Sequence, residues 1–307
     1  MEVFHSIKDL VATRGSGYSN LLVRRPMQIT VFCIGFAVLL MFLICNYPSP
    51  FRVSTISNYF NGVSTKEKHE STLESILRNA SMENNTVIIT NLNDAWAEPG
   101  SIFDVFRESF RIGNETQRFL NHLVVINWDQ KAQDTDVMWL RNPFKHFQED
   151  ADFQTSCDYF TGNSSDLNNA PNTGFSYVKS NEKTIWLYKF WFNSSKLYPN
   201  LHDQDAFNMI KIHPNISSMN LKIRFLSTTY FGGFCRPSDD FNQVCTMHAN
   251  CCVGLDNKVN DLKILLQDWK NYMALPQIEK QQSHRSWTVP QLCRTSFQRM
   301  HQRHNKR

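Results

Sequence analysis

The sequence predicts an α/β fold, in which a sheet is flanked by helices, and three observations support it. Two short apolar runs, TVIIT at 86–90 and LVVI at 123–126, have the length and the β-branched composition of buried strands. A segment with helical apolar spacing lies between them, at 102–110. The order strand, helix, strand is typical of a unit with parallel strands. A chain of 307 residues is long enough for one large domain or two small ones.

The segments around the first strand predict a binding edge. We expect Ser101 to be the N-cap of the helix, with Asp104 as its capping partner three residues later. A second helix is expected over 116–122. The turn-rich loop 91–100 follows the first strand, and ligands of such sheets bind beyond the carboxyl ends of the strands. Residues 91–96 are therefore expected to form one wall of a site.

Later segments continue the same pattern. The expected elements are a strand at 174–179, an aromatic-rich helix at 183–193, a helix at 203–212, a strand at 223–226 and a glycine turn at 230–235. The globular part is expected to span 74–275, followed by a loose, basic C-terminal extension at 276–307. The last fourteen residues hold five Lys or Arg and no acid, which favours a solvated tail. The chain has no basic patch with interleaved aromatic residues, so nucleic acid is not an expected partner.

An uncharged apolar run at 29–45 predicts a membrane anchor. At ~1.5 Å per residue the run spans about 25 Å, at the short end of the range for a transmembrane helix. A cleaved signal peptide is the alternative, but the run begins late and no small-x-small site follows it. Basic residues precede the run, so the positive-inside rule places the N-terminus in the cytosol. We expect a cytosolic tail (1–26), a signal anchor (27–46) and a luminal stem (47–73).

Two further patterns fit a luminal location after the anchor. Six Asn-x-Ser/Thr sequons are candidate N-glycosylation sites, at Asn79, Asn84, Asn114, Asn163, Asn193 and Asn215. Six of the eight cysteines also follow the anchor, at Cys157, Cys235, Cys245, Cys251, Cys252 and Cys293. An even number of cysteines in an oxidising compartment predicts disulfides, while their spacing leaves the connectivity open.

The sequence DTD at 134–136 is the main candidate for chemistry. Two carboxylates one residue apart, Asp134 and Asp136, can hold a hard divalent ion such as Mn²⁺ or Mg²⁺, which can in turn hold a diphosphate. A solvated turn is the alternative, because such pairs are common by chance. The apolar segment 137–140 and the proline turn RNPF at 141–144 follow directly. This context indicates an acid pair that the fold positions, and it favours the metal site.

These motifs form a larger constellation. TVIITNLNDAWAEPGSIFDVFRESFRIG, DTDVMWLRNPF, NTGFSYVKSN, HDQDAFN, YFGGFC and MHANCCVGLDNK occur in this order. Together they resemble the plant nucleotide-diphospho-sugar transferases of glycosyltransferase family 77, over roughly residues 74 to 275. The resemblance implies a GT-A fold, which is a Rossmann-like mixed sheet flanked by helices, in a single-pass type II enzyme of the Golgi membrane.

The resemblance also implies a reaction. A pentose or galactose would be transferred from a UDP-sugar to a cell-wall polysaccharide or glycoprotein, with Mn²⁺ or Mg²⁺ as cofactor. Departure of the diphosphate needs a Lewis acid, and the developing oxocarbenium ion needs polar groups, most naturally a carboxylate, nearby. The motifs therefore predict a metal-dependent glycosyltransferase that keeps its catalytic domain in the lumen.

The family pattern assigns site residues at matching positions. Asp134 and Asp136 match the metal and diphosphate motif, and His248 lies where retaining GT-A enzymes often place a late metal ligand. The residues implied for the nucleotide-sugar site are Thr90, Asn91, Asn172, Thr173 and Gly174. The acid motif near the reacting sugar comprises Asp203, Gln204 and Asp205, and either aspartate would supply the carboxylate.

Some of the polar residues assigned to the site also have simpler, structural interpretations. His202 and Asp203 could only cap the helix that follows them. His248 with Cys251 and Cys252 could form a zinc cluster, although adjacent cysteines in an oxidising lumen more often form disulfides.

The aromatic residues and the glycines also have simpler interpretations. Trp96, Trp186 and Trp191 could be sugar platforms, but core positions are favoured. Gly232 and Gly233 favour a tight turn over a phosphate loop.

One part of the family pattern is missing from this sequence. In that pattern several dozen residues separate a strand such as LVVINWDQ from the acid pair, and they include an apolar strand that ends just before it. Here Gln130 is followed by Asp134 with three residues between. An omitted exon, a gene-model error or a true deletion would each produce this arrangement. We therefore expect an incomplete central sheet. A non-catalytic or defective transferase-like luminal protein is the alternative function.

Overall fold

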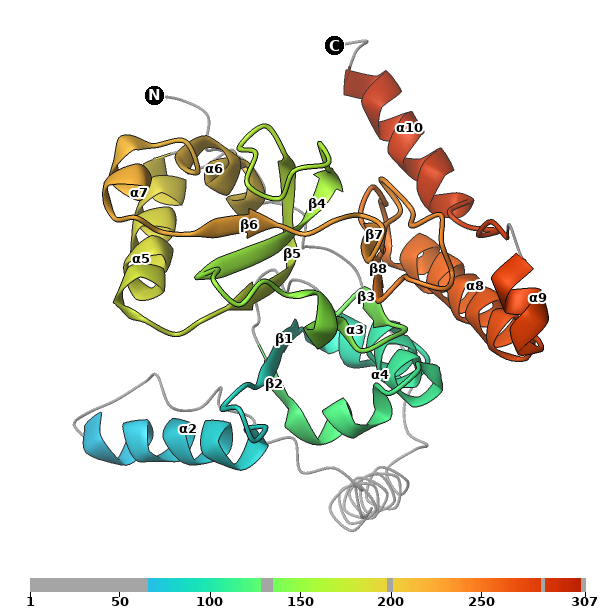
Figure 1. Cartoon of the computed structure of the whole chain (residues 1–307), viewed down its shortest axis with the longest axis horizontal. Helices are drawn as coiled ribbons and strands as arrows, with labels where there is room; N and C mark the ends of the chain where they lie inside the picture. The colour runs from blue at the N-terminus through green and yellow to red at the C-terminus, as the bar shows by residue number, and fades with distance from the viewer. Residues whose placement is uncertain (1–65, 128–134, 198–200, 283–284, 305–307) are drawn as a thin grey trace, which may run out of the picture. The chain divides into compact units, whose positions relative to one another are not determined.

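The structure is a computed structural model of the chain, and it describes residues 66–127, 135–197, 201–282 and 285–304. These residues form a mixed α/β arrangement with three small sheets flanked by helices, which confirms the predicted class (Figure 1). The predicted anchor at 27–46 and Asp134 of the acid pair lie outside the described residues. Within the described ranges no helix is both long and apolar enough to cross a bilayer.

The predicted parallel pair of strands is confirmed. β1 (Ile88–Leu92) and β2 (Leu123–Asn127) form a two-stranded parallel sheet. The helices around this pair are α2 (Lys66–Ala80) before β1, and α3 (Asp94–Ala97), α4 (Ile102–Ile112) and the 3-10 helix η2 (Gln117–His122) between the strands. The connection therefore follows the order strand, helix, strand that the apolar pattern predicts.

The helix α4 begins where predicted, but its cap bonds differ from the prediction. The Ser101 hydroxyl donates to the Ala95 carbonyl at 3.1 Å and makes no cap bond. The Asp104 carboxylate accepts from the backbone N–H of Gly100 at 2.8 Å. The expected capping box is wrong because Gly100, with φ of +78°, presents its own N–H to the first helical turn.

The second sheet begins directly after the DTD motif. Its strand order is β3–β8–β7, with β3 (Val137–Trp139) antiparallel to β8 (Thr246–His248) and β8 parallel to β7 (Phe231–Gly233). The short helix η3 (Pro143–His146) follows β3 at the predicted proline turn. The sheet therefore brings residue 136 and residue 248, far apart in sequence, to neighbouring strand ends.

The predicted glycine turn at 230–235 is wrong, because Gly232 and Gly233 lie in the strand β7. Both glycines are needed for close packing. A Cβ on Gly232 would lie 2.6 Å from the backbone nitrogen of Ser238, and a Cβ on Gly233 would lie 2.6 Å from Oδ1 of Asn250. The glycines thus allow two other segments to approach the strand.

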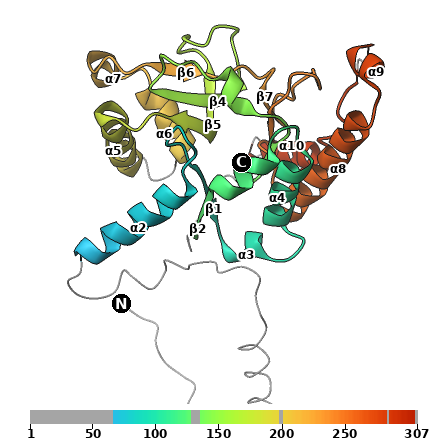
Figure 2. The same ribbon diagram turned by 60° about the horizontal axis from the view of Figure 1, so that its bottom comes forward.

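The third sheet has the strand order β5–β4–β6. Its strands are β4 (Phe153–Tyr159), β5 (Ala170–Val178) and β6 (Ile223–Phe225), with β4 antiparallel to β5 and parallel to β6. The helices α5 (Glu182–Leu197), α6 (Asp203–Ile210) and α7 (Pro214–Ser218) lie together beside this sheet in both views (Figures 1 and 2). The central strand β4 was not predicted, because its sequence FQTSCDY buries polar side chains and lacks an apolar alternation.

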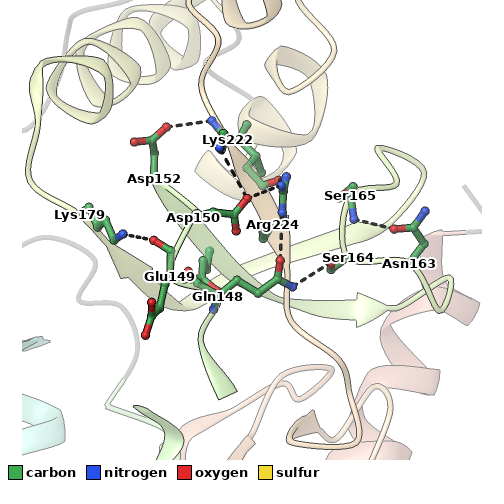
Figure 3. A network of polar contacts seen from close by, with 12 residues as sticks. Gln148, Glu149, Asp150, Asp152, Asn163, Ser164, Ser165, Lys179, Lys222 and Arg224 are labelled. Atoms are coloured by element: carbon green, nitrogen blue, oxygen red, sulfur yellow. Dashed lines mark hydrogen bonds and ion pairs between the residues drawn. The ribbon is translucent and has the colours of Figure 1, made fainter. Parts of the chain in front are cut away.

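A polar network fixes the start of this sheet (Figure 3). Arg224 on β6 donates to Gln148 Oε1 at 3.0 Å and to Asp150 Oδ2 at 2.9 Å. Gln148 in turn donates to Ser164 Oγ at 2.9 Å. These side chains tie the segment before β4 to β6 and to the loop between β4 and β5. The network thereby supports the strands that carry site residues at their other ends.

The globular part ends with α8 (Leu255–Met273). The segment 276–307, expected as a loose basic extension, contains the helices α9 (Gln277–Gln282) and α10 (Leu292–His304). The fully buried carboxylate of Asp261 accepts from the backbone N–H groups of Gln291 and Cys293, both at 2.9 Å, and so caps α10. A disulfide joins Cys293 to Cys252, and a second joins Cys235 to Cys251. The prediction of disulfides is confirmed.

Two apolar cores hold the sheets and helices together. The larger core joins α4, β3, β7, β8 and α8, and the smaller one joins β4, β6, α5 and α6. In the larger core the ring of Phe110 stacks on that of Trp139, with the centroids 4.9 Å apart. Trp139 is only three residues from Asp136, so this core positions the end of the acid motif.

Phe110→Ala should lower the free energy of unfolding by about 3–5 kcal/mol, because it leaves a cavity beside Trp139. Phe192→Ala is the matched control, since Phe110 is fully buried and Phe192 is 63% exposed. The control should change stability by less than about 0.5 kcal/mol. Chemical denaturation measures both variants, and an equal loss in the two would contradict this packing.

Candidate functional site

The candidate site forms around the carboxylate of Asp136, directly before β3. The backbone carbonyl of Asp136 accepts from the Ala249 N–H at 2.9 Å, which extends the β3–β8 ladder by one bond. Because the two strands are antiparallel, this register brings His248 beside Asp136. The Asp136 side chain is 1% exposed, and His248 is also buried. The sheet therefore brings together two of the three predicted metal ligands.

Asp136 makes two charged contacts, one with each carboxylate oxygen. Its Oδ1 lies 3.2 Å from His248 Nε2, and its Oδ2 accepts from Lys258 Nζ at 2.6 Å. Burial alone would raise the pKa of the Asp136 carboxyl, but the charges of His248 and Lys258 outweigh it and hold the pKa well below the usual range. Asp136 is thus an ionised carboxylate in a buried place, compensated by two basic groups.

Lys258 was not predicted as a site residue, although it ends the motif MHANCCVGLDNK. It lies in the first turn of α8, and its Nζ also lies 5.5 Å from the ring centroid of Trp96. Trp96 is on α3, directly after β1. Lys258 therefore lies between the acid motif and the predicted binding loop. Its position was missed because α8 itself was not predicted.

Asn172 fixes the orientation of the His248 ring, on the side of the ring away from Asp136. His248 Nδ1 lies 3.0 Å from Asn172 Oδ1, and this oxygen also accepts from the Gly174 N–H at 3.0 Å. The amide nitrogen of Asn172 donates to Asp158 Oδ1 at 2.7 Å, which settles which way the amide faces. An amide oxygen can only accept, so His248 Nδ1 carries a proton. In the imidazolium form Nε2 also carries a proton and donates it to Asp136 Oδ1, and loss of that proton would leave the Nε2 lone pair for an ion.

Asp158 at the end of β4 is the centre of this network, and no sequence pattern pointed to it. Its Oδ1 accepts from Asn172 and from Asn250 Nδ2, each at 2.7 Å, and its Oδ2 accepts from Gln204 Nε2 at 3.0 Å. Asn250 Oδ1 in turn accepts from the Cys235 N–H at 3.0 Å. Asp158 was missed because it ends an unpredicted strand and belongs to no recognisable motif.

The acid motif on α6 divides into three different environments. The side chain of Gln204 joins the network through Asp158. The Asp205 carboxylate accepts from the His202 N–H at 3.2 Å, which is a helix-capping contact. The Asp203 backbone carbonyl accepts from the Trp191 indole at 2.7 Å, and its side chain is half-buried. His202 is the N-cap, as the simpler interpretation expects, but the carboxylate that caps belongs to Asp205.

The predicted nucleotide-sugar residues lie in two places. Asn172 belongs to the polar network, and Thr173 is half-buried beside it on β5. Thr90 and Gly174 line a cavity between β1 and β5, and Asn91 is half-buried on β1. The structure therefore brings Asn172 to His248, while Thr90 and Asn91 lie on the separate sheet of β1 and β2.

The donor set at Asp136 fits a divalent ion in part. Two cis ligands of an octahedral ion lie about 3.0 Å apart when each bond is ~2.1 Å, and Asp136 Oδ1 and His248 Nε2 are 3.2 Å apart. Lys258 contacts the other carboxylate oxygen, Oδ2, and not this pair. The hydroxyl of Thr135, beside them in sequence, is buried without a hydrogen-bond partner in the described part of the chain. No cluster of three His, Cys, Asp or Glu occurs among the described residues, and Asp134 lies outside them.

The zinc interpretation of His248, Cys251 and Cys252 is excluded by the disulfides. Both sulfurs are bonded, to Cys235 and Cys293 respectively, so neither is a thiolate ligand. The disulfides instead hold the loop that follows His248.

The tryptophans differ in their surroundings. Trp191 is a core residue, as favoured, and Trp186 packs against the same core and stacks on Phe190. Trp96 is half-buried near Lys258. Of these three tryptophans, Trp96 is the one that lies next to the candidate site.

The asparagines of the six predicted sequons are all exposed, at positions 79, 84, 114, 163, 193 and 215. Their exposure leaves each side chain accessible to modification. Two cysteines, Cys157 and Cys245, are buried as free thiols. Burial raises the pKa of each thiol to about 12, and the charge of Asp158 adds to the effect at Cys157.

Cys157 and Cys245 should therefore resist alkylation in the folded protein. At pH 8 a thiol with a pKa near 12 is a thiolate in about one molecule in ten thousand. Site-resolved mass spectrometry after iodoacetamide treatment should find both residues unlabelled in buffer and labelled in guanidinium. Rapid labelling of either residue in buffer would contradict their burial.

Comparison with known proteins identifies one family model and two plant relatives. The family model described as nucleotide-diphospho-sugar transferase matches residues 107–262. The chain is 38% identical to "Uncharacterized protein At4g15970" of Arabidopsis thaliana, over 75% of this chain and 77% of the relative. It is 31% identical to "Uncharacterized protein At1g28695" of the same plant, over 75% of this chain and 88% of the relative. No solved structure gave a significant match.

The first of these alignments is longer than the part of this chain that it contains. It extends over 282 positions, while 75% of 307 residues is about 230, so about 50 positions of the alignment hold no residue of this chain.

The matched family region includes β3, β4, β5 and β8, the strands that carry or adjoin the Asp136, Asp158, Asn172 and His248 network. The chain belongs to the nucleotide-diphospho-sugar transferase family.

Proposed function

We propose that this protein is a GT-A glycosyltransferase of family 77 that transfers a pentose or galactose from a UDP-sugar. The buried cluster of Asp136, His248 and Lys258 carries the proposal, because it combines an ionised carboxylate, an oriented imidazole and an ammonium group. A diphosphate leaving group needs such a concentration of cationic partners. The cluster lies within the region that matches the family.

Asp136 and His248 would hold a divalent ion, with Asp134 as a further ligand. Mn²⁺ or Mg²⁺, when bound, supplies Lewis-acid neutralisation of the developing charge on the diphosphate. Lys258 adds a positive charge beside the same carboxylate and would contact the phosphate oxygens directly. Asn172 keeps the proton on His248 Nδ1 and so leaves Nε2 available to the ion.

The polar network would also position the donor sugar. Asp158 holds both Asn172 and Gln204, so β5 and α6 present their polar groups on either side of one carboxylate. Gln204 would contact sugar hydroxyls, while Asp203 or Asp205 supplies the carboxylate near the reacting carbon. Thr90, Asn91, Thr173 and Gly174 would line the nucleotide and sugar portions of the donor.

The exposed sequons and the disulfides support a luminal enzyme. We propose a type II protein of the Golgi membrane, with the anchor at 27–46 and an acceptor that is a cell-wall polysaccharide or glycoprotein. Two disulfides and six exposed sequon asparagines suit an oxidising, glycosylating compartment.

A non-catalytic transferase-like protein is the second candidate, and one observation favours it. β1 and β2 form a sheet of their own and share no strand pairing with the sheet of β3 among the described residues. The nucleotide edge and the cation site are then held on separate sheets. Binding of UDP without transfer would indicate this second function.

Asp136→Ala should abolish metal-dependent binding of UDP. In the full-length protein, UDP with Mn²⁺ at about 100 times its Kd should stabilise the fold by ~2.7 kcal/mol, and UDP alone by much less. Thermal unfolding measures both effects. Asp239→Ala, at an exposed position, is the matched control and should keep the full shift. Equal shifts in the two variants would contradict the assigned site.

Asp205→Asn should reduce transfer from UDP-sugars while it leaves the UDP and Mn²⁺ shift unchanged. The reason is that Asp205 is assigned to the sugar and not to the diphosphate. Release of UDP in the presence of acceptor measures transfer, and Asp203→Asn is tested in parallel because either carboxylate fits the role. Loss of UDP binding together with transfer would refute this division of roles.

A further inference from the structure

Asn250 lies between a disulfide and the carboxylate of Asp158. It follows the last residue of β8 by two positions, and its side chain is half-buried. Its Oδ1 accepts from the Cys235 N–H at 3.0 Å, and its Nδ2 donates to Asp158 Oδ1 at 2.7 Å. Because one end of the amide only accepts and the other only donates, a single orientation of the amide makes both contacts.

The neighbouring strand β7 leaves a space that the Asn250 amide fills. A Cβ at Gly233 would lie 2.6 Å from Oδ1 and 2.8 Å from Nδ2 of Asn250. These separations are shorter than a Cβ makes with a non-bonded neighbour, so any residue larger than glycine would displace the amide. The place of the amide is thus determined by packing and by a hydrogen-bond partner at each end.

The Cys235–Cys251 disulfide closes this arrangement. Cys251 directly follows Asn250, and its partner Cys235 is the residue whose backbone N–H donates to the Asn250 amide. The Cα atoms of the two cysteines are 5.2 Å apart. The backbone of Cys251 has a φ of +50°, a left-handed conformation that residues other than glycine seldom adopt. The covalent bond holds the chain in this conformation beside the amide.

Asp158 connects Asn250 to two residues assigned to the site. Its carboxylate also accepts from Asn172 Nδ2 at 2.7 Å and from Gln204 Nε2 at 3.0 Å. The three donors are neutral amides from three separate segments, so each supplies a large share of the hydrogen bonding that orients the carboxylate. Asn172 in turn contacts His248, and Gln204 lies on α6. A displacement of Asp158 would therefore move polar groups on β5 and on α6.

We propose that Asn250 is a positioning residue of the site and that the Cys235–Cys251 disulfide holds it in place. Asn250 touches no substrate in this proposal, and it acts through Asp158 on Asn172 and Gln204. The consequence for sugar binding rests on the proposed function. The consequence for the two amides does not, because it concerns the protein alone.

The second disulfide offers a comparison within the same loop. Cys252–Cys293 begins at the next residue, but Cys293 lies on α10 and its N–H donates to Asp261. The two cysteines are 41 residues apart in sequence, against 16 for Cys235 and Cys251. Closing a longer loop stabilises a fold more, so loss of Cys252–Cys293 should lower Tm further. Loss of Cys235–Cys251 should instead disturb the Asp158 contacts more.

Asn250→Asp in the full-length protein tests the positioning role. The new carboxylate still accepts from the Cys235 N–H, but it replaces the donor to Asp158 by a like charge, which repels. Exchange of the side-chain amide protons of Asn172 and Gln204 with water, measured by NMR, should become about tenfold faster.

Asn271→Asp is the matched control, because it makes the same change at an exposed position near the other end of α8. It should leave both exchange rates unchanged. Equal acceleration in Asn271→Asp and Asn250→Asp would mean a general effect of added charge and would overturn the proposal.

Binding gives a second measurement, with Mn²⁺ present and with UDP, UDP-xylose and UDP-galactose as probes. Asn250→Asp should weaken the tighter UDP-sugar about tenfold and UDP by a smaller factor, since UDP lacks the sugar that Gln204 would contact. Equal weakening of UDP and the UDP-sugar would contradict a role in positioning for the sugar.

Paired variants test the disulfide. Cys235→Ala with Cys251→Ala should accelerate exchange at the two amides. Cys252→Ala with Cys293→Ala should lower Tm further and leave the exchange unchanged. A purely structural role would give the same order of the two pairs in both measurements. The single change at Asn250 keeps the test decisive if a pair of alanines prevents folding.

Unchanged exchange in Asn250→Asp would overturn the positioning role. Equal acceleration in the two alanine pairs would overturn the role of the Cys235–Cys251 disulfide. Failure of the unmodified protein to bind any of the three nucleotides, with the expected exchange rates, would refute only the proposed function.

Discussion

The arrangement of the site depends on the compensation of one buried negative charge. Asp136 is ionised although it is almost fully buried, and a buried carboxylate is costly unless it is paired and hydrogen-bonded. Its compensation comes from β8 through His248 and from α8 through Lys258. Three features bring these groups together. They are the antiparallel register of β3 and β8, the start of α8 and the glycines of β7.

A second carboxylate connects this centre to the rest of the protein. Asp158 ends β4, and it binds side chains from β5, from α6 and from the loop after β8. Through Asn172 it also fixes the ring of His248. The third sheet is thus joined to the second by directed hydrogen bonds and not only by apolar contact, and a rigid network of this kind keeps polar groups in place without reorganisation when a ligand binds.

Sequence patterns predicted the parts of the fold that depend on local apolar spacing. The strands β1 and β2, the helix α4 and the helices α5 and α6 all follow such spacing. β4 escaped prediction because its buried residues are polar and gain their partners only from distant segments. In the site, Asp136 and His248 were found through motifs, while Asp158 and Lys258 were not, because their roles arise from tertiary contacts. The glycine turn failed because those glycines provide space for Asn250 and not a reversal of the chain.

The cation site is assembled from the second and third sheets. Asp136 directly precedes β3, and His248, Asn172 and Asp158 lie on β8, β5 and β4, where the hydrogen bonds and ion pairs described above join them. Among the described residues no strand pairing connects β1, which carries Thr90 and Asn91, to the sheet that carries the charge. The nucleotide and the cation can then each bind to a separate sheet. Binding of both does not by itself hold the donor in one reactive geometry.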